Sequence, residues 1–259
     1  MTTTLVPRVL VRGPGLRPPG LARGPHLWVV RAPEPGVPLD ESVLDAVERR
    51  RAAALRRPAE RALYVAAHSA LRRVLSAYTG VAAPALRMVR QPCPRCGEPH
   101  GRPAVAGPAG TGVHFSLSHS DGLALLALAP APVGADLQRV PEARVVREAS
   151  RSLHPSERGQ LDSLPAEARP AAFARCWSRK EAFLKARGDG LSLRALREVY
   201  VGSGARPSGP AGWSFADVEV PAGWAGACVV RSAARLSPPA TPPVRQQVPC
   251  ASRGSRVRR

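Results

Sequence analysis

Hydrophobic residues along the chain follow two spacings, one in which every second position is apolar and one that repeats about every 3.6 residues. The first spacing and short apolar runs predict strands at 26–31, 114–118, 123–129, 133–140, 199–201, 213–220 and 227–231. The second spacing predicts helices at 39–56, 59–78, 141–153, 155–161 and 166–186. The segment 84–112 holds several prolines and glycines, so we expect loops and one short strand there.

A Pro-Ala-Pro segment at 130–132 separates two halves, 26–131 and 132–235, and each half mixes a few strands with long helices. The pattern is therefore typical of an α+β fold. Residues 1–25 are rich in Pro, Gly and Arg, and residues 236–259 are rich in Pro, Ser and Arg. Neither end shows a periodic apolar pattern, so we expect both to be disordered basic tails.

Composition narrows the class of protein. The chain has 259 residues with 44% hydrophobic and 22% charged residues, which are ordinary values for a globular protein. No apolar run is long enough for a transmembrane helix, and the start lacks the apolar core of a secretory signal. The five cysteines are odd in number and unevenly spaced, which argues against a disulfide framework and favours a reducing cytoplasm.

The formal net charge of +19 favours an anionic ligand or partner. Nucleic acid, an acidic protein and a polyphosphate cofactor all fit this charge. Only two of the 38 basic residues are lysines, and both of them, Lys180 and Lys185, lie within residues 177–185. Lysine is a compact point charge, unlike the planar guanidinium of arginine, so this pair suggests a chemical requirement. The alternative is two lysines on a solvated helix face.

Two short segments carry acidic side chains suited to a metal. On the expected strand at 133–140, Asp136 and Gln138 point to the same side and offer oxygen ligands of the kind that Mg²⁺ prefers. Glu181 lies four residues before Lys185 on one helix face, at the edge of an apolar stripe, where a carboxylate needs a partner. A metal shared with Asp136 would be one. The plainer alternatives are a turn or helix-capping Asp136 and a surface ion pair.

Two further segments hold candidate ligand-binding groups. Ser118 and His119 end an expected strand before a tight turn, where donors could reach a phosphate. The loop 93–103 contains Cys93, Cys96 and His100, a spacing that suggests zinc, but no second Cys/His pair follows to complete four ligands. In the same loop, Arg102 presents a positive group.

In this order the segments resemble the 4′-phosphopantetheinyl transferases of the surfactin-synthetase-activating type. Each motif alone is weak, and the ordered set over about residues 26–232 carries the resemblance. The matching segments are Cys96–Pro103, Phe115–Ser120, Gly134–Gln138, Trp177–Lys185 and Gly188–Leu193.

The resemblance implies transfer of 4′-phosphopantetheine from coenzyme A to a serine of an apo acyl or peptidyl carrier protein, with release of adenosine 3′,5′-bisphosphate. This is holo-acyl-carrier-protein synthase activity. The implied fold has two similar α+β halves around a pseudo-twofold axis, with coenzyme A in the cleft between them. A cytoplasmic monomer serving polyketide or nonribosomal peptide carrier domains is the implied setting.

The resemblance also assigns roles to residues of this chain. Glu181 would accept the serine proton, and Lys185 would neutralise charge on the leaving group. The implied Mg²⁺ ligands are Asp136, Glu181 and Gln138. The implied coenzyme A contacts are Arg102, Ser118, His119, Lys180 and Lys185.

The sequence departs from the family pattern at two places. Gln138 stands where the family often has Glu, and a neutral amide is a poorer Mg²⁺ ligand. The family often has an arginine near Leu63, where the nearest candidates here are Arg57 and Arg61. Two other functions remain open: a basic nucleic-acid-binding module, and a relative that binds coenzyme A or a carrier protein without catalysis.

Overall fold

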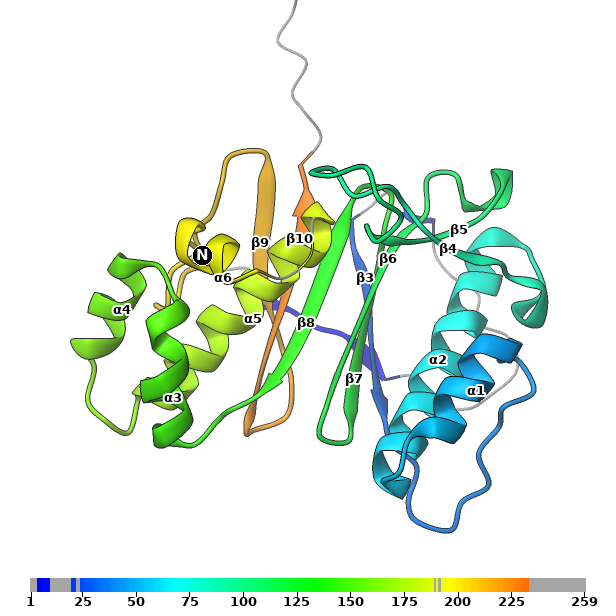
Figure 1. The fold of residues 1–259 in the computed structure, drawn as a ribbon, viewed down its shortest axis with the longest axis horizontal. Coiled ribbons are helices and arrows are strands. Elements are labelled where there is room, and N and C mark those ends of the chain that lie inside the picture. Colours follow the sequence, from blue (N-terminus) through cyan, green and yellow to red (C-terminus); the bar gives the residue numbers. More distant parts are fainter. Residues whose placement is uncertain (1–3, 10–19, 22–23, 189, 191, 233–259) are drawn as a thin grey trace, which may run out of the picture.

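The computed structural model of the protein describes residues 4–9, 20–21, 24–188, 190 and 192–232. Two four-stranded sheets form its centre, and β6 and β8, one from each sheet, lie side by side (Figure 1). The first sheet has the order β2 (Arg8–Val9), β3 (His26–Arg31), β7 (Leu123–Ala129), β6 (His114–Ser120). The second has the order β1 (Thr4–Leu5), β9 (Trp213–Val218), β10 (Trp224–Arg231), β8 (Val133–Arg139). A separate antiparallel pair joins β4 (Met88–Arg90) to β5 (Pro103–Val105).

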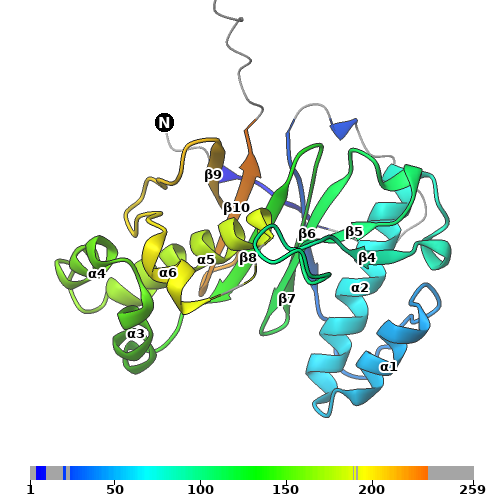
Figure 2. The ribbon, with the colours of Figure 1, turned by 45° about the horizontal axis from the view of Figure 1, so that its top comes forward.

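Helices flank the sheets at both ends of the molecule (Figures 1 and 2). Beside the first sheet lie α1 (Ala46–Ala54) and α2 (Pro58–Thr79). Beside the second sheet lie α3 (Ala143–Ala149), α4 (Pro155–Asp162), α5 (Arg169–Arg187) and α6 (Leu193–Glu198). The mixed α+β class expected from the sequence is confirmed.

Strand β7 is apolar at every position because other elements pack against both of its faces. Ala124 and Leu126 point into the core cluster that contains the apolar face of α2. Leu125 and Ala127 point the other way, into a cluster shared with β8 and β10. A strand buried on both faces needs apolar residues at every position rather than at alternate ones.

A glycine in β8 allows α5 to lie directly against the second sheet. A Cβ atom built on Gly134 would stand 1.9 Å from the backbone oxygen of Ala182, far inside van der Waals contact. Side chains two residues apart on a strand share a face, so Asp136 and Gln138 lie on the face of β8 that carries α5. The close approach at Gly134 therefore brings the α5 side chains over Asp136.

Most predicted elements are present, and several details differ. The helix expected at 39–56 begins only at Ala46, because Asp45 and Glu48 form a capping box that ends the preceding loop. The short helix α6 was not predicted. The strand expected at 199–201 is absent because side chains bind its backbone groups. The Lys180 ammonium donates to the carbonyl of Val199, and Glu157 accepts from the amide of Val201.

The expectation of disorder over residues 1–25 is wrong for residues 4–9. Thr4 and Leu5 pair in parallel with β9, and Arg8 and Val9 pair in parallel with β3. The arm thus joins the edges of both sheets. The tail at 236–259 lies outside the described residues. Among the helices of the described segments, none has the length and apolarity to cross a membrane.

Candidate functional site

A cavity of about 1420 Å³ lies between the two halves. The first half contributes residues of α1, α2, β4 and β6 and the loop before β5, and the second half contributes residues of α5 and the segment after it. The volume exceeds the roughly 300–1000 Å³ of an ordinary small-molecule pocket, which suits a long ligand.

Charge around this cavity is mixed rather than uniformly positive. The cationic lining residues are Arg51, Arg57, Arg90, Arg102 and Lys185. The acidic lining residues are Asp45, Glu48, Glu60, Asp121 and Glu181. Several of these acids already have a basic partner: Asp45 and Glu48 bind Arg72, which lies behind the wall, and Glu60 binds Arg57. Arg51 on α1 has no acidic partner among the ion pairs described, and Arg102 and Lys185 add positive groups from the loop before β5 and from α5.

Asp136 is the centre of a buried polar cluster at the α5 side of the cavity. Its side chain is only 3% exposed. Oδ1 accepts hydrogen bonds from Ser118 Oγ at 2.7 Å and from Lys185 Nζ at 2.6 Å. Lys185 Nζ also donates to Ser118 Oγ at 3.0 Å. Three elements, β6, β8 and α5, therefore fix one carboxylate.

Glu181 joins the same cluster from α5. Its Oε2 lies 3.9 Å from Lys185 Nζ, and its Oε1 accepts a hydrogen bond from Trp177 Nε1 at 2.8 Å. Burial raises the pKa of Glu181, and the nearby Asp136 carboxylate raises it further, against the opposing effects of Lys185 and Trp177. The structure thus brings together two acids that are 45 positions apart in the sequence. The hydrogen bond from Trp177 was not foreseen, although the four-residue spacing could have revealed it.

The donor set fits a hard divalent cation. Asp136 Oδ2 is buried and has no hydrogen-bond partner among the described residues. An orphaned carboxylate oxygen in such a place costs free energy unless something binds it. Burial is the main cause of the raised pKa of Glu181, and the Asp136 carboxylate adds to it, so the two acids also repel each other across this site. A cation between them would relieve both costs.

Ser118 does not have the position that the sequence suggested. It is buried and is not part of the cavity lining. Its hydroxyl proton is directed to Asp136 and its oxygen accepts from Lys185, so it has no donor left for a phosphate. The hydroxyl thus positions Asp136, and a nucleotide contact of Ser118 stays a prediction that these hydrogen bonds do not support.

His119 and Gln138 differ in how they meet the cavity. His119 lines the wall, and burial, followed by the nearby His68 and Lys185, lowers its pKa, which favours the neutral imidazole. Gln138 is half-buried on the Asp136 face of β8 but is not part of the lining. Its place as a metal ligand stays a prediction.

Arg102 bridges the two halves at the rim. Its guanidinium donates to the carbonyl of Ala186 near the end of α5 at 2.8 Å and to Gln91 Oε1 at 3.1 and 3.2 Å. A cation at a helix C-terminus is favoured by the helix dipole. Of the two candidates from the first long helix, Arg57 lines the cavity, whereas Arg61 is paired with Glu41 outside it.

Lys180 lies outside the cavity lining, so the structure does not support the coenzyme A contact that the resemblance implied for it. Its side chain is fully buried, its ammonium lies 2.7 Å from Glu157 Oε2, and it also donates to the carbonyls of Leu196 and Val199. Residues five apart on a helix are turned by about 140° from each other, so Lys180 and Lys185 face different sides of α5. Lys180 holds α4 and α6 against α5.

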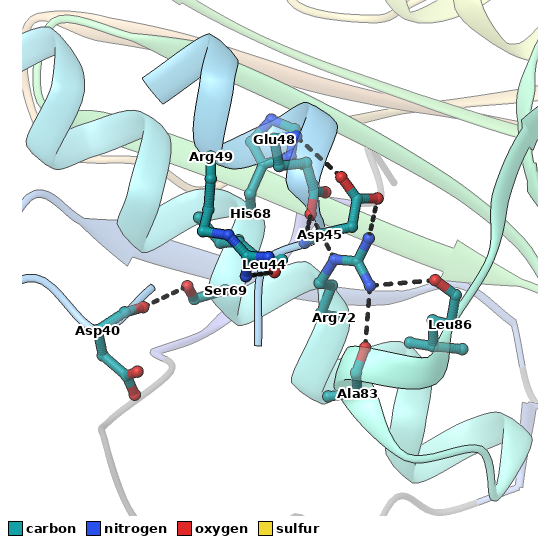
Figure 3. A network of polar contacts seen from close by, with 10 residues as sticks. All are labelled: Asp40, Leu44, Asp45, Glu48, Arg49, His68, Ser69, Arg72, Ala83 and Leu86. Atoms are coloured by element: carbon teal, nitrogen blue, oxygen red, sulfur yellow. Dashed lines mark hydrogen bonds and ion pairs between the residues drawn. The ribbon is translucent and has the colours of Figure 1, made fainter. Parts of the chain in front are cut away.

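The opposite wall contains a polar network that the sequence did not reveal. Figure 3 shows the buried Arg72 guanidinium between Asp45, Glu48 and two backbone carbonyls. Glu48 Oε1 also lies 3.1 Å from Nδ1 of His68, a cavity residue stacked on Tyr64. Because these partners come from distant positions, no local motif marks them.

Part of one predicted motif, Gly188–Leu193, lies outside the described residues, namely 189 and 191. Gly188 caps α5 in the left-handed conformation with a φ of 87° and lines the cavity together with Gly190.

Comparison with known proteins gives matches to one superfamily. The profile of the 4′-phosphopantetheinyl transferase superfamily matches residues 132–211, which include Asp136, Glu181 and Lys185. The 4′-phosphopantetheinyl transferase HetI of Nostoc sp. is 33% identical over 68% of this chain and 73% of its own length. The protein slr0495 of Synechocystis sp., provisionally named as the same kind of enzyme, is 30% identical over 65% of this chain and 66% of its own. A transferase of Bacillus pumilus is 40% identical over 30% of this chain and 34% of its own.

Proposed function

Because the chain belongs to the 4′-phosphopantetheinyl transferase superfamily, we propose that it transfers 4′-phosphopantetheine from coenzyme A to a serine hydroxyl of an apo carrier protein. The observation that carries the proposal is a cluster in which Glu181 and Lys185, both on the wall of the large cavity, meet the buried Asp136 directly behind it. Adenosine 3′,5′-bisphosphate would be the leaving group.

The side chains at the site have the chemistry for this transfer. Glu181 presents a carboxylate at the cavity wall and can accept the serine proton as the hydroxyl oxygen attacks phosphorus. The side chain of Lys185 is one-third exposed, and its ammonium can donate to the phosphate oxygens that gain charge as the bond to the nucleotide breaks.

Magnesium is part of the proposal. Asp136 would hold it through Oδ2, the buried oxygen without a partner, and Glu181 through its carboxylate. When bound, such an ion offsets the charge of the diphosphate and orients it. Ser118 and Lys185 hold the other Asp136 oxygen and thereby set the direction in which Oδ2 points.

The finer parts of the proposal rest on the resemblance and on topology. Each half runs strand, helix, strand, strand (β3, α2, β6, β7 and β8, α5, β9, β10), and the last strand of each lies between the other two. This repeated order supports a pseudo-twofold relation between halves 26–131 and 132–235. We further propose the surfactin-synthetase-activating subgroup, a monomer, a cytoplasmic location and secondary-metabolism carrier domains as clients.

The test is incubation with coenzyme A, Mg²⁺ and several apo carrier proteins, followed by intact-protein mass spectrometry. We expect each accepted carrier to gain the mass of one phosphopantetheine arm, and EDTA to stop the gain. Glu181→Gln and Asp136→Asn should lose transfer by at least about 100-fold. Glu198→Gln is the matched control, because this carboxylate lies on the exposed surface of α6 and pairs only with Arg194 among the contacts described.

Failure of every carrier to gain mass would reject the proposal. Retained binding of coenzyme A without transfer would point to the non-catalytic relative, and salt-sensitive binding of DNA or RNA without transfer would point to the nucleic-acid module.

A further inference from the structure

The loop 91–102 brings together a second set of potential metal ligands. These are sulfur and imidazole groups, whereas the cluster around Asp136 offers carboxylates. One ligand atom each from Cys93, Cys96 and His100 lies within 4.8 Å of the other two. Cys93 is buried, whereas Cys96 and His100 are exposed. From this juxtaposition we propose that the protein binds one Zn²⁺ through Cys93 Sγ, Cys96 Sγ and the His100 imidazole.

Backbone hydrogen bonds build the loop around these atoms. The amide of Gly97 donates to the carbonyl of Cys93 at 2.9 Å, which closes a tight turn between the two cysteines. Gly97 follows with a φ of 77°, a left-handed conformation that favours glycine. The amides of Cys93 and His100 both donate to the carbonyl of Glu98, at 2.7 and 2.8 Å. The turn thus places the histidine beside the cysteines.

The spacing of the ligand atoms suits a tetrahedral zinc. Bonds of about 2.3 Å to sulfur and about 2.0 Å to nitrogen set neighbouring ligand atoms about 3.5–3.8 Å apart. Cys96 Sγ and His100 Nε2 lie 3.0 Å apart, and the whole set lies within 4.8 Å. Small side-chain movements would therefore complete the geometry. Binding would displace the two thiol protons to solvent, because thiolates are the ligands.

Sulfur and imidazole ligands select zinc over magnesium, which takes hard oxygen ligands. No fourth Cys, His, Asp or Glu joins the set among the described residues. We assign the fourth position to water. The sequence argued against zinc because a fourth protein ligand is missing. Zinc sites with three protein ligands and one water are known, so the missing fourth ligand does not exclude zinc here.

A zinc ion in this loop would stiffen one rim of the large cavity. His100 lies on the wall of the large cavity, and Arg102, two residues later, reaches α5. The loop is held to its own base by hydrogen bonds between Gln91 and residues 101 and 102. Zinc would add a cross-link within the loop, so its removal should loosen the rim while leaving the two sheets intact.

The experiment uses the full chain, purified with a non-thiol reductant and without chelator. We expect about one zinc per chain by elemental analysis. After removal of zinc, titration with Co²⁺ should give thiolate-to-cobalt charge-transfer absorption and the intense visible bands of tetrahedral cobalt. Cys96→Ser and His100→Ala should bind cobalt at least about tenfold more weakly. Both side chains are exposed, so circular dichroism should stay unchanged.

Two controls make the result specific. Glu98→Gln changes an exposed acid in the same loop, and Cys228→Ala removes a buried thiol in β10, far along the chain from the loop. Both variants should give the same Co²⁺ titration as the unchanged protein. The proposal is overturned if no charge-transfer band forms, if Cys96→Ser keeps it, or if the reduced protein re-forms a Cys93–Cys96 disulfide and takes up no metal. Because the readout is spectroscopic, it is independent of the transfer assay.

Discussion

Replacement of Lys180 by methionine separates a structural role from a ligand-binding one. The lysine ammonium and the Glu157 carboxylate are both fully buried and 2.7 Å apart. Methionine keeps much of the stem volume but removes the charge. Glu157 would then be left as a buried carboxylate held by the amides of His154, Val201 and Gly202 and by the Cys176 thiol, with no cation beside it.

The expected cost is large. Removal of one partner from a buried ion pair costs about 3–5 kcal/mol. A chain of this size loses roughly 2–4 °C of melting temperature per kcal/mol, so Lys180→Met should melt roughly 10 °C lower. The carbonyls of Leu196 and Val199 also lose their donor. Adding Glu157→Gln to Lys180→Met should restore part of the stability, because no isolated charge remains.

Thermal melts by circular dichroism measure the stability, and calorimetry below the melting range measures affinity for adenosine 3′,5′-bisphosphate. Lys180→Met should bind within about twofold of the unchanged protein. Lys185→Met should bind at least about tenfold more weakly, since a charged hydrogen bond is worth about 1.5–3 kcal/mol. The reasoning is refuted if Lys180→Met melts normally and yet loses affinity.

Three other predictions concern the same side of the molecule. Gly134→Ala should lower the free energy of unfolding by about 1–3 kcal/mol and reduce transfer, because the new Cβ forces α5 away at Ala182. Urea titration measures the free energy of unfolding and a turnover assay measures transfer. Transfer at the wild-type rate would contradict this prediction. Ser118→Ala should raise the Mg²⁺ concentration needed for half-maximal transfer about tenfold, since Asp136 loses an orienting hydrogen bond; an unchanged Mg²⁺ titration would exclude this role. Burial is the chief cause of the lowered pKa of His119, so folding favours the neutral imidazole. The stability that this neutral imidazole contributes is complete above about pH 6.5 and is lost as the pH falls through the lowered pKa. His119→Gln should therefore flatten the fall in melting temperature between pH 7 and pH 5, and an unchanged slope would refute the assignment.

The sequence predicted elements well where local pattern and burial agree. The strands at 26–31 and 123–129 form with the predicted bounds, because each is a short apolar run closed by turn residues. The loop before β6 holds β4 and β5 rather than one strand, since each has only three residues and gains its stability from pairing. Elements whose partners are distant in sequence leave little local signal.

The site residues were also predictable only where a local sequence pattern marks them. Asp136 and Glu181 lie in recognisable segments, and the structure brings them together as expected. The burial of Lys180 depends on Glu157, which no motif marks, although the five-residue step from Lys185 already indicated a different helix face. The Arg72 network depends on a loop and two helices and was beyond reach of local reasoning.

The first residues of the chain have a consequence for how the protein should be handled. Residues 4–5 complete the β9 edge and residues 8–9 complete the β3 edge, with Val6 and Pro7 crossing between the two sheets. Deleting this short strap would uncover two rows of unpaired backbone groups at once, and open strand edges recruit other chains. A shortened expression product that starts after residue 9 should aggregate during purification, even though the polar cluster around Asp136 is left unchanged.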